Sequence, residues 1–176
     1  AHPELGDEEY EASRKHVAYL RSYGFEVTYP FCDLPTAYQA VIGKGHRPVI
    51  ALLAEYDALP GMGHACGHNV HGAMSLLAGA GLAGTVAESG LAELRVIGTP
   101  AEETNGAKVA MVDKGVFADV DFALVIHSSA GTTFTEYRCL AMDALEFTFT
   151  GKAAHAAGAP WEGRNALNGL QLFFHA

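Results

Sequence analysis

The chain has few cysteines, few basic residues and no long uninterrupted apolar run. Its three cysteines lie far apart and form no Cys-x-x-Cys pair, which excludes a disulfide framework, a closed four-ligand zinc knuckle and a c-type haem site. This cysteine usage suits a reducing compartment, and we expect a cytoplasmic protein. The chain has 11 Lys and Arg against 20 Asp and Glu, and the net charge of -9 comes with no basic cluster. We therefore expect no nucleic-acid partner.

The most apolar segment is interrupted by Gly84, Glu88 and Gly90, so it falls short of the roughly 20 apolar residues that span a bilayer. We expect no membrane partner. At 176 residues and 49% hydrophobic content, the chain can bury one core and part of a second.

Alternating helix and strand patterns predict an α/β sandwich. Apolar residues recur with helical spacing from Asp7 to Tyr23, and Gly24 is a typical helix end. The run from Val49 to Ala54 is continuously apolar, as in a strand covered on both faces, and Asn69 is expected to cap the helix that follows. Strands are expected at 25–31, 37–42, 48–55, 94–98 and 122–126, and further helices at 69–84 and 107–114.

The pattern changes after about Arg138. Residues 144–150 alternate like a half-exposed antiparallel strand, 151–158 resemble a turn, and a helix is expected to begin near Asn165. One strand and one helix cannot bury a core. We therefore expect one domain at 1–140 and, at 141–176, only the start of a second domain that is truncated here.

The segment from Gly61 to His71 places a thiol and three imidazoles on a glycine-rich loop. Cys66 and His68 supply the donor types that zinc and similar transition metals select. We interpret the loop as a metal site, and we expect His64 to be a loop residue and His71 to face the pocket or cap the helix.

Further polar residues follow the predicted buried strands. Asp57, the pair Glu102 and Glu103, and His127 each come after a strand end. Because ligands bind at the carboxyl ends of strands in open α/β sheets, we expect these segments to converge on one crevice. Adjacent carboxylates point in different directions, so one can bind a metal while the other faces the water on it.

Five segments together resemble the metallopeptidase family of aminoacylases and glutamate carboxypeptidases. More narrowly, they are similar to its amidohydrolase branch, which includes indole-acetyl-amino-acid hydrolases, aminobenzoyl-glutamate hydrolase and related dipeptidases. The segments are His2-Pro-Glu-Leu-Gly, Ala54-Glu-Tyr-Asp-Ala-Leu-Pro60, Gly63-His-Ala-Cys-Gly-His68, Gly98-Thr-Pro-Ala-Glu-Glu103 and Gly151-Lys-Ala-Ala-His155.

The resemblance implies a zinc-exopeptidase-like three-layer αβα sandwich and two divalent metal ions, zinc or manganese. Cys66, as a bridging thiolate, and His68, Glu103 and His127 would be metal ligands. Glu102 would be the general base, and Asp57 a carboxylate behind the metal that orients a ligand.

The second domain would be a lid and dimerisation domain. His155 would reach the active site of a partner subunit and polarise the substrate carbonyl, and Arg164 and Asn165 would bind the substrate carboxylate or oxyanion. The resemblance thus implies a homodimer.

Glu55 stands where the wider family has a ligand histidine, a change that is typical of this branch. Two features depart from the family pattern. Asn69 stands where an aspartate is more usual. A last ligand histidine lies in a C-terminal part that this chain lacks, and His175 does not match it.

We expect an enzyme that hydrolyses the amide bond of N-acyl or N-aminoacyl amino acids or dipeptides by a metal-activated water. One alternative is a truncated, non-catalytic fragment that binds metal weakly or serves in dimerisation. Another is a cysteine hydrolase with Cys66 as nucleophile and His68 or His127 as base.

Overall fold

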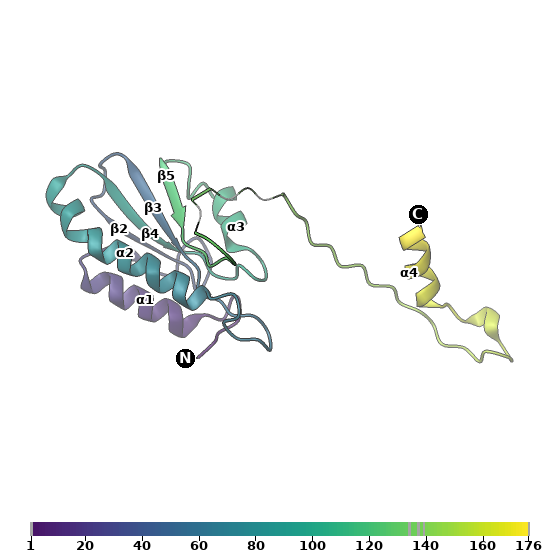
Figure 1. Cartoon of the computed structure of the whole chain (residues 1–176). Helices are drawn as coiled ribbons and strands as arrows, with labels where there is room; N and C mark the ends of the chain where they lie inside the picture. The colour runs from purple at the N-terminus through teal and green to yellow at the C-terminus, as the bar shows by residue number, and fades with distance from the viewer. Residues whose placement is uncertain (1, 134, 137, 139, 176) are drawn as a thin grey trace. The chain divides into compact units, whose positions relative to one another are not determined.

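The computed structural model describes residues 2–133, 135–136, 138 and 140–175, and the chain divides after Thr132 into two units. In the described part of the first unit, five strands form one mixed sheet: β1 (Glu26–Thr28), β2 (Tyr38–Ile42), β3 (Val49–Ala54), β4 (Glu93–Gly98) and β5 (Phe122–Val125). The strand order is β1-β2-β4-β3-β5 (Figure 1). β3 runs parallel to β4 and β5, whereas β2 runs antiparallel to β1 and β4.

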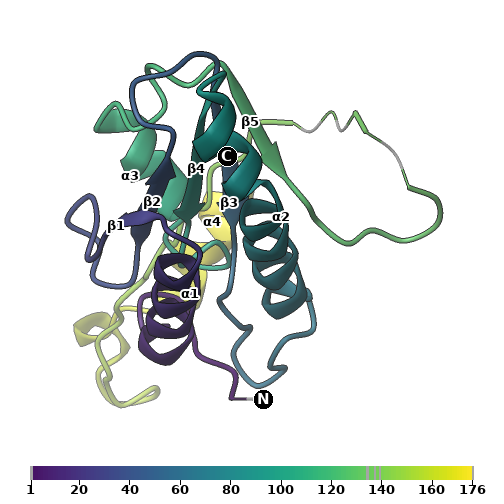
Figure 2. The ribbon, with the colours of Figure 1, turned by 90° about the vertical axis from the view of Figure 1, so that its left-hand side faces the viewer.

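Helices cover both faces of the sheet. α1 (Tyr10–Ser22) and α2 (His68–Ser89) lie side by side over one face, and α3 (Ala107–Asp113) lies over the other (Figures 1 and 2). The predicted α/β sandwich is confirmed, and its three layers place helices on either side of β3 and β4.

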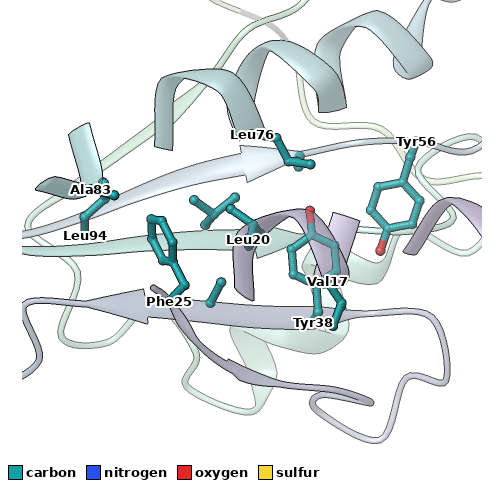
Figure 3. Packing of buried hydrophobic residues seen from close by; sticks show 11 residues of the cluster. Val17, Leu20, Phe25, Tyr38, Tyr56, Leu76, Ala83 and Leu94 are labelled. Atoms are coloured by element: carbon teal, nitrogen blue, oxygen red, sulfur yellow. The ribbon is translucent and has the colours of Figure 1, made fainter. Parts of the chain in front are cut away.

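The larger core lies between the sheet and the helices α1 and α2 (Figure 3). Val17 and Leu20 of α1 and Leu76 of α2 are buried there against Tyr38 and Val96 of the strands. Their burial at helical spacing explains why α1 forms where the sequence pattern placed it.

A smaller core fills the other face. Ile97, which follows Val96 on β4, packs with Ala51 of β3 and Met111 of α3. Neighbouring residues of β4 thus serve opposite faces, because side chains alternate along a strand. The edge strand β5 is exposed along its whole length.

The start of α2 differs from the prediction. The helix begins at His68, its N-cap is Gly67 with a φ of +88°, and the side chain of Asn69 makes no cap hydrogen bond. Gly67 can adopt this left-handed conformation without a Cβ clash, so the helix begins two residues earlier than it would with Asn69 as its N-cap. The helix also continues past Gly84 to Ser89 and ends at Gly90, whose φ is +60°.

Two glycines let α2 approach the sheet closely. A Cβ on Gly72 would lie 2.5 Å from the Glu55 carbonyl oxygen, and one on Gly79 would lie 2.6 Å from a methyl carbon of Val96. This close packing places the first turn of α2 against the end of β3.

By length and composition alone α2 is apolar enough to cross a membrane, which our sequence argument did not anticipate. A core helix meets the same criteria, and α2 buries Leu76, Ala80 and Ala83 in the first unit.

The second unit contains the helix α4 (Ala166–His175) and a short 3-10 turn, Pro160–Glu162. The strand predicted at 144–150 is wrong: these residues have no partner strand in the described part of the chain. An isolated alternating segment cannot form a ladder, whatever its side-chain pattern. The rings of Phe147 and Phe149 lie 4.4 Å and 6.2 Å from the ring of Phe173 on α4, but no described residue of this unit is buried.

Candidate metal centre

The segments that follow β3, β4 and β5 bring the predicted chemical groups of the first unit together. Glu55 and Asp57 continue the line of β3, and the backbone N–H of Thr99 extends the pairing of β4 by donating to the Ala54 carbonyl at 2.8 Å. Cys66 and His68 arrive with the start of α2. His127 comes two residues after the end of β5. The predicted convergence at this edge of the sheet is confirmed.

A buried hydrogen-bonded chain forms the base of the centre. The Oδ1 atom of Asp57 accepts a hydrogen bond from His68 Nδ1 at 2.8 Å, and its Oδ2 atom accepts the backbone N–H of Glu103 at 2.9 Å. Burial raises the pKa of Asp57, but these hydrogen bonds outweigh it and hold the pKa below its ordinary value. Asp57 therefore fixes the ring of His68 with its proton on Nδ1.

The other ring nitrogen of His68 faces three carboxylates. Its Nε2 atom lies 3.6 Å from Glu55, 3.7 Å from Glu102 and 3.8 Å from Glu103, too far for hydrogen bonds. Among the described residues, His68 Nε2 and Glu55 Oε2 are buried without a hydrogen-bond partner. A nitrogen lone pair that faces carboxylate oxygens in a buried site is the arrangement that a cation would satisfy.

Protonation of His68 is favoured by the same carboxylates. Burial lowers its pKa, but the hydrogen bond to Asp57 and the charges of Glu55 and Glu102 outweigh burial, and the net shift is upward. A proton and a cation thus compete for this nitrogen.

Cys66 and His127 complete the donor set at the exposed side. The Sγ atom of Cys66 lies 3.5 Å from Nε2 of His127. One donor atom each from Cys66, His68 and Glu103 lie within 4.8 Å of one another. Thiolate, imidazole and carboxylate donors fit zinc, and imidazole and carboxylate also suit manganese.

The thiol of Cys66 is not activated as a nucleophile. Burial, followed by a hydrogen bond to Glu103 and the nearby carboxylates, raises its pKa to about 11. A catalytic cysteine needs a lowered pKa, so the geometry does not favour the cysteine-hydrolase alternative.

Glu102 lies in a strained loop that Glu9, the N-cap of α1, supports. Ala101, directly before it, is fully buried and has a φ of +55°, a left-handed conformation that a non-glycine residue rarely adopts. Its backbone N–H donates to Oε1 of Glu9 at 2.7 Å, while Thr36 donates to Oε2 of Glu9 at 2.8 Å. Glu9 is fully buried, and burial raises its pKa.

Sequence reasoning did not identify Glu9, because it reads as one more acidic residue at the start of an amphipathic helix. Its partners Thr36 and Ala101 are distant in sequence, so no local pattern signals the contact.

Two further residues belong to the centre. Glu55 and His71, with His68 and His127, form a second group whose donor atoms lie within 4.8 Å of one another. The Nζ atom of Lys108 on α3 lies 2.5 Å from Oε1 of Glu55. We expected His71 only to face the pocket or cap the helix, although it lies three residues after His68, a spacing that places both on one helix face.

His71 contacts the segment after β5. Its Nε2 atom accepts the backbone N–H of Ser128 at 2.8 Å and lies 2.9 Å from the Ser128 hydroxyl. Burial, with the neighbouring imidazoles of His127 and His68, lowers its pKa. Its Nδ1 atom is buried without a hydrogen-bond partner among the described residues.

The predicted substrate residues lie in the second unit. Nδ1 of the exposed His155 accepts the backbone N–H of Gly158 at 2.8 Å, and Oδ1 of Asn165 accepts that of Leu167 at 3.0 Å, at the start of α4. Arg164 pairs through its backbone with Lys152. These contacts are local turns and a helix cap, so the roles assigned to the three residues rest on the resemblance.

The comparisons with known proteins agree with this geometry. Residues 51–157 match the family described as peptidase family M20/M25/M40. The chain is 38% identical to one of the p-aminobenzoyl-glutamate hydrolase polypeptides of Escherichia coli, over 97% of this chain and 39% of that protein. It is 36% identical to the mouse Xaa-Arg dipeptidase, over 98% of this chain and 42% of that protein.

Among solved structures, a Bacillus subtilis protein described as a dinuclear metal binding peptidase from the M20 family is similar. It has a TM-score of 0.60 and 33% identity, over 69% of this chain and 38% of that one. The chain spans about two fifths of the length of these relatives.

Proposed function

The chain belongs to peptidase family M20/M25/M40, and on this premise we propose that it carries the metal centre of an amidohydrolase. The substrates are N-acyl or N-aminoacyl amino acids or dipeptides, in line with the names of its relatives. The observation that carries this proposal is the buried Nε2 atom of His68, which has no hydrogen-bond partner among the described residues, is held by Asp57 and faces three carboxylates. An exposed acidic loop without a function would not bury such a nitrogen unpaired.

Cys66, His68, Glu103 and His127 would hold two divalent ions, zinc or manganese. When bound, the ions would supply Lewis-acid chemistry, polarising the amide carbonyl and acidifying the attacking water. Asp57 acts behind them, because its two oxygens hold both the ring of His68 and the backbone of Glu103.

Glu102 is the general base in this proposal. Its side chain is 38% exposed, against 20% for Glu103 and none for His68, so Glu102 can meet both water and substrate. It takes a proton from the attacking water as the oxygen bonds to the amide carbon. It then gives that proton to the nitrogen of the leaving amine as the C–N bond breaks.

Residues 141–176 form the start of a lid and dimerisation domain in this proposal. His155 would stabilise the oxyanion in the active site of a partner subunit, and Arg164 and Asn165 would bind the substrate carboxylate. The protein would then act as a homodimer.

A substitution of Glu102 by Gln tests the assignment of the base. We expect Glu102→Gln to keep the metal content of the wild-type protein, measured by elemental analysis, and to lower kcat by about 100- to 10,000-fold on a panel of acyl-amino acids and dipeptides. The control is Glu88→Gln, an exposed position at the end of α2, which should leave both quantities unchanged. Full turnover in Glu102→Gln with metal bound would overturn the assignment. Substoichiometric metal and no turnover in the wild-type protein would favour the non-catalytic alternative.

A further inference from the structure

We infer that His71 is a positioning residue of the metal centre and not one of its ligands. The backbone of Ser128 fixes the proton of the His71 ring, and through this contact α2 holds the segment that carries His127. The inference rests on the proposed metal centre, but its first step concerns the metal-free protein.

The hydrogen bond from Ser128 decides which nitrogen of His71 carries the proton. A backbone N–H can only donate, and that of Ser128 lies 2.8 Å from His71 Nε2 with hydrogen-bond geometry. Nε2 must therefore offer its lone pair. A neutral imidazole has one N–H, so the proton of His71 is on Nδ1.

This tautomer excludes His71 from the ligand set. The four groups of Glu55, His68, His71 and His127 are close enough to share an ion. A protonated Nδ1 has no lone pair for a cation, and Nε2 has already given its lone pair to Ser128. His71 instead presents an N–H toward Oε2 of Glu55, 3.8 Å away. Glu55 therefore lies between this N–H and the ammonium group of Lys108.

Ser128 also connects the two exposed ligands. Its hydroxyl has one proton, and because the N–H already occupies the His71 lone pair, that proton goes to the Cys66 carbonyl at 3.0 Å. The Ser128 carbonyl in turn accepts Nδ1–H of His127 at 2.8 Å, which leaves Nε2 of His127 free for a metal. The contact at Ser128 thus sets the 3.5 Å approach of Cys66 Sγ to His127 Nε2.

Gly67 leaves little spare room around this contact. A Cβ on Gly67 would lie 3.3 Å from the Ser128 hydroxyl and 3.4 Å from His71 Nε2. The Cys-Gly-His loop, the first turn of α2 and the segment after β5 therefore pack together at one place.

The first experiment is long-range ¹H–¹⁵N correlation spectroscopy of the histidine rings in metal-free protein. The His71 signals are assigned by their loss in His71→Gln. We expect an unprotonated Nε2 and a protonated Nδ1 for His71. A protonated Nε2 in metal-free protein would overturn the inference.

Zinc addition then shows whether His71 is a metal ligand or a supporting residue. We expect the Nε2 signals of His68 and His127 to shift and the His71 tautomer to remain. Loss of the Nδ1 proton of His71 on zinc addition would make it a ligand and overturn the inference. If zinc shifts the Nε2 signals of neither His68 nor His127, the proposed function is refuted. The spectrum of the metal-free protein still decides the tautomer of His71 in that case.

Metal affinity provides a second readout. We expect His71→Leu to weaken zinc binding by about 10- to 100-fold without changing the number of ions, as supporting residues do. His71→Gln should recover most of the loss, because its carbonyl can accept the Ser128 N–H and its amide can donate toward Glu55. Ser128→Ala keeps the N–H and should keep the tautomer. Loss of an ion in His71→Leu, or no recovery in His71→Gln, would contradict the positioning role.

Discussion

The metal centre has a buried base, which comprises Asp57 and His68, and an exposed rim, which comprises Cys66, Glu102 and His127. These two parts of the site are held in different ways. At the base, Asp57 and His68 are fully buried and joined by a hydrogen bond of 2.8 Å. At the rim, Cys66, Glu102 and His127 are more accessible to solvent, and their support comes from backbone contacts of neighbouring loops. The base is thus organised to orient a ligand, whereas the rim is accessible to solvent and can exchange protons with substrate.

This difference shows where each kind of function belongs. A ligand that is already oriented loses little conformational freedom when it binds an ion. A general base must instead reach water and substrate, which the rim allows. Substitution of the ligand His68 should therefore affect metal binding more strongly than substitution of the general base Glu102 at the rim.

The largest effect is expected at His68. His68→Gln removes the buried nitrogen that faces three carboxylates, and we expect metal affinity to fall by more than the roughly 100-fold typical of supporting residues. At least one ion should be lost, together with turnover. Elemental analysis after dialysis measures the loss of metal. An unchanged ion count would show that His68 does not bind metal.

Asp57→Asn tests the support behind that ligand. We expect metal affinity to fall by about 10- to 100-fold, because an asparagine has one acceptor oxygen for two donors. Competition with a chromophoric chelator measures the affinity. An Asp57→Asn protein with wild-type metal affinity would mean that His68 needs no carboxylate to orient it.

The pH dependence of metal binding reports on the rim. The pKa of Cys66 is about 11 in the metal-free protein, so the thiol must lose its proton when it binds an ion. Below that pKa, affinity should rise about tenfold for each pH unit from this group alone. It should fall further as pH drops through the raised pKa of His68. Chelator competition between pH 6 and 8 measures the slope of metal affinity against pH. Cys66→Ser should reduce this slope. An equal slope in the variant would exclude a thiolate ligand.

The smallest effect is expected at Glu9, the N-cap of α1, which supports the rim through Ala101. Glu9→Leu leaves the buried N–H of Ala101 without an acceptor, and we expect a loss of about 2 kcal/mol in the free energy of unfolding. We also expect a lower kcat with unchanged metal content. Glu9→Gln can still accept this N–H and should lose less than about 1 kcal/mol. Urea unfolding measures the free energy of unfolding of both variants. Equal losses of stability in Glu9→Leu and Glu9→Gln would contradict the role of this hydrogen bond.

The sequence predicted the parts of the fold that depend on local pattern. The continuous apolar run of β3 and the helical spacing of α1 identified both elements. The predicted N-cap of α2 was wrong by two residues, because the left-handed Gly67 and not Asn69 precedes the helix. The predicted strand at 144–150 failed, since a ladder depends on a partner that the local pattern does not contain.

Within the site, the sequence predicted the residues that follow buried strands. Asp57 was expected behind the ligands and Glu103 was expected to be one of them, and the structure joins the two residues through one hydrogen bond. Long-range contacts were missed: the pair of Glu55 and Lys108, 53 residues apart, and the hydrogen bond of Glu9 to Ala101, 92 apart, have no local signal. His71 was expected to face the pocket or cap the helix, and its spacing of three residues from His68 also predicts that both lie on one helix face.

The most direct test is the metal content of the purified protein beside that of Cys66→Ser, with Cys32→Ser as the matched control. Cys32 is a free, half-buried cysteine that belongs to neither ligand group. We expect two ions per chain in the wild-type protein and in Cys32→Ser, and loss of metal in Cys66→Ser. Wild-type protein without bound metal in excess zinc or manganese, or Cys66→Ser with an unchanged ion count, would contradict a metal centre built on this loop.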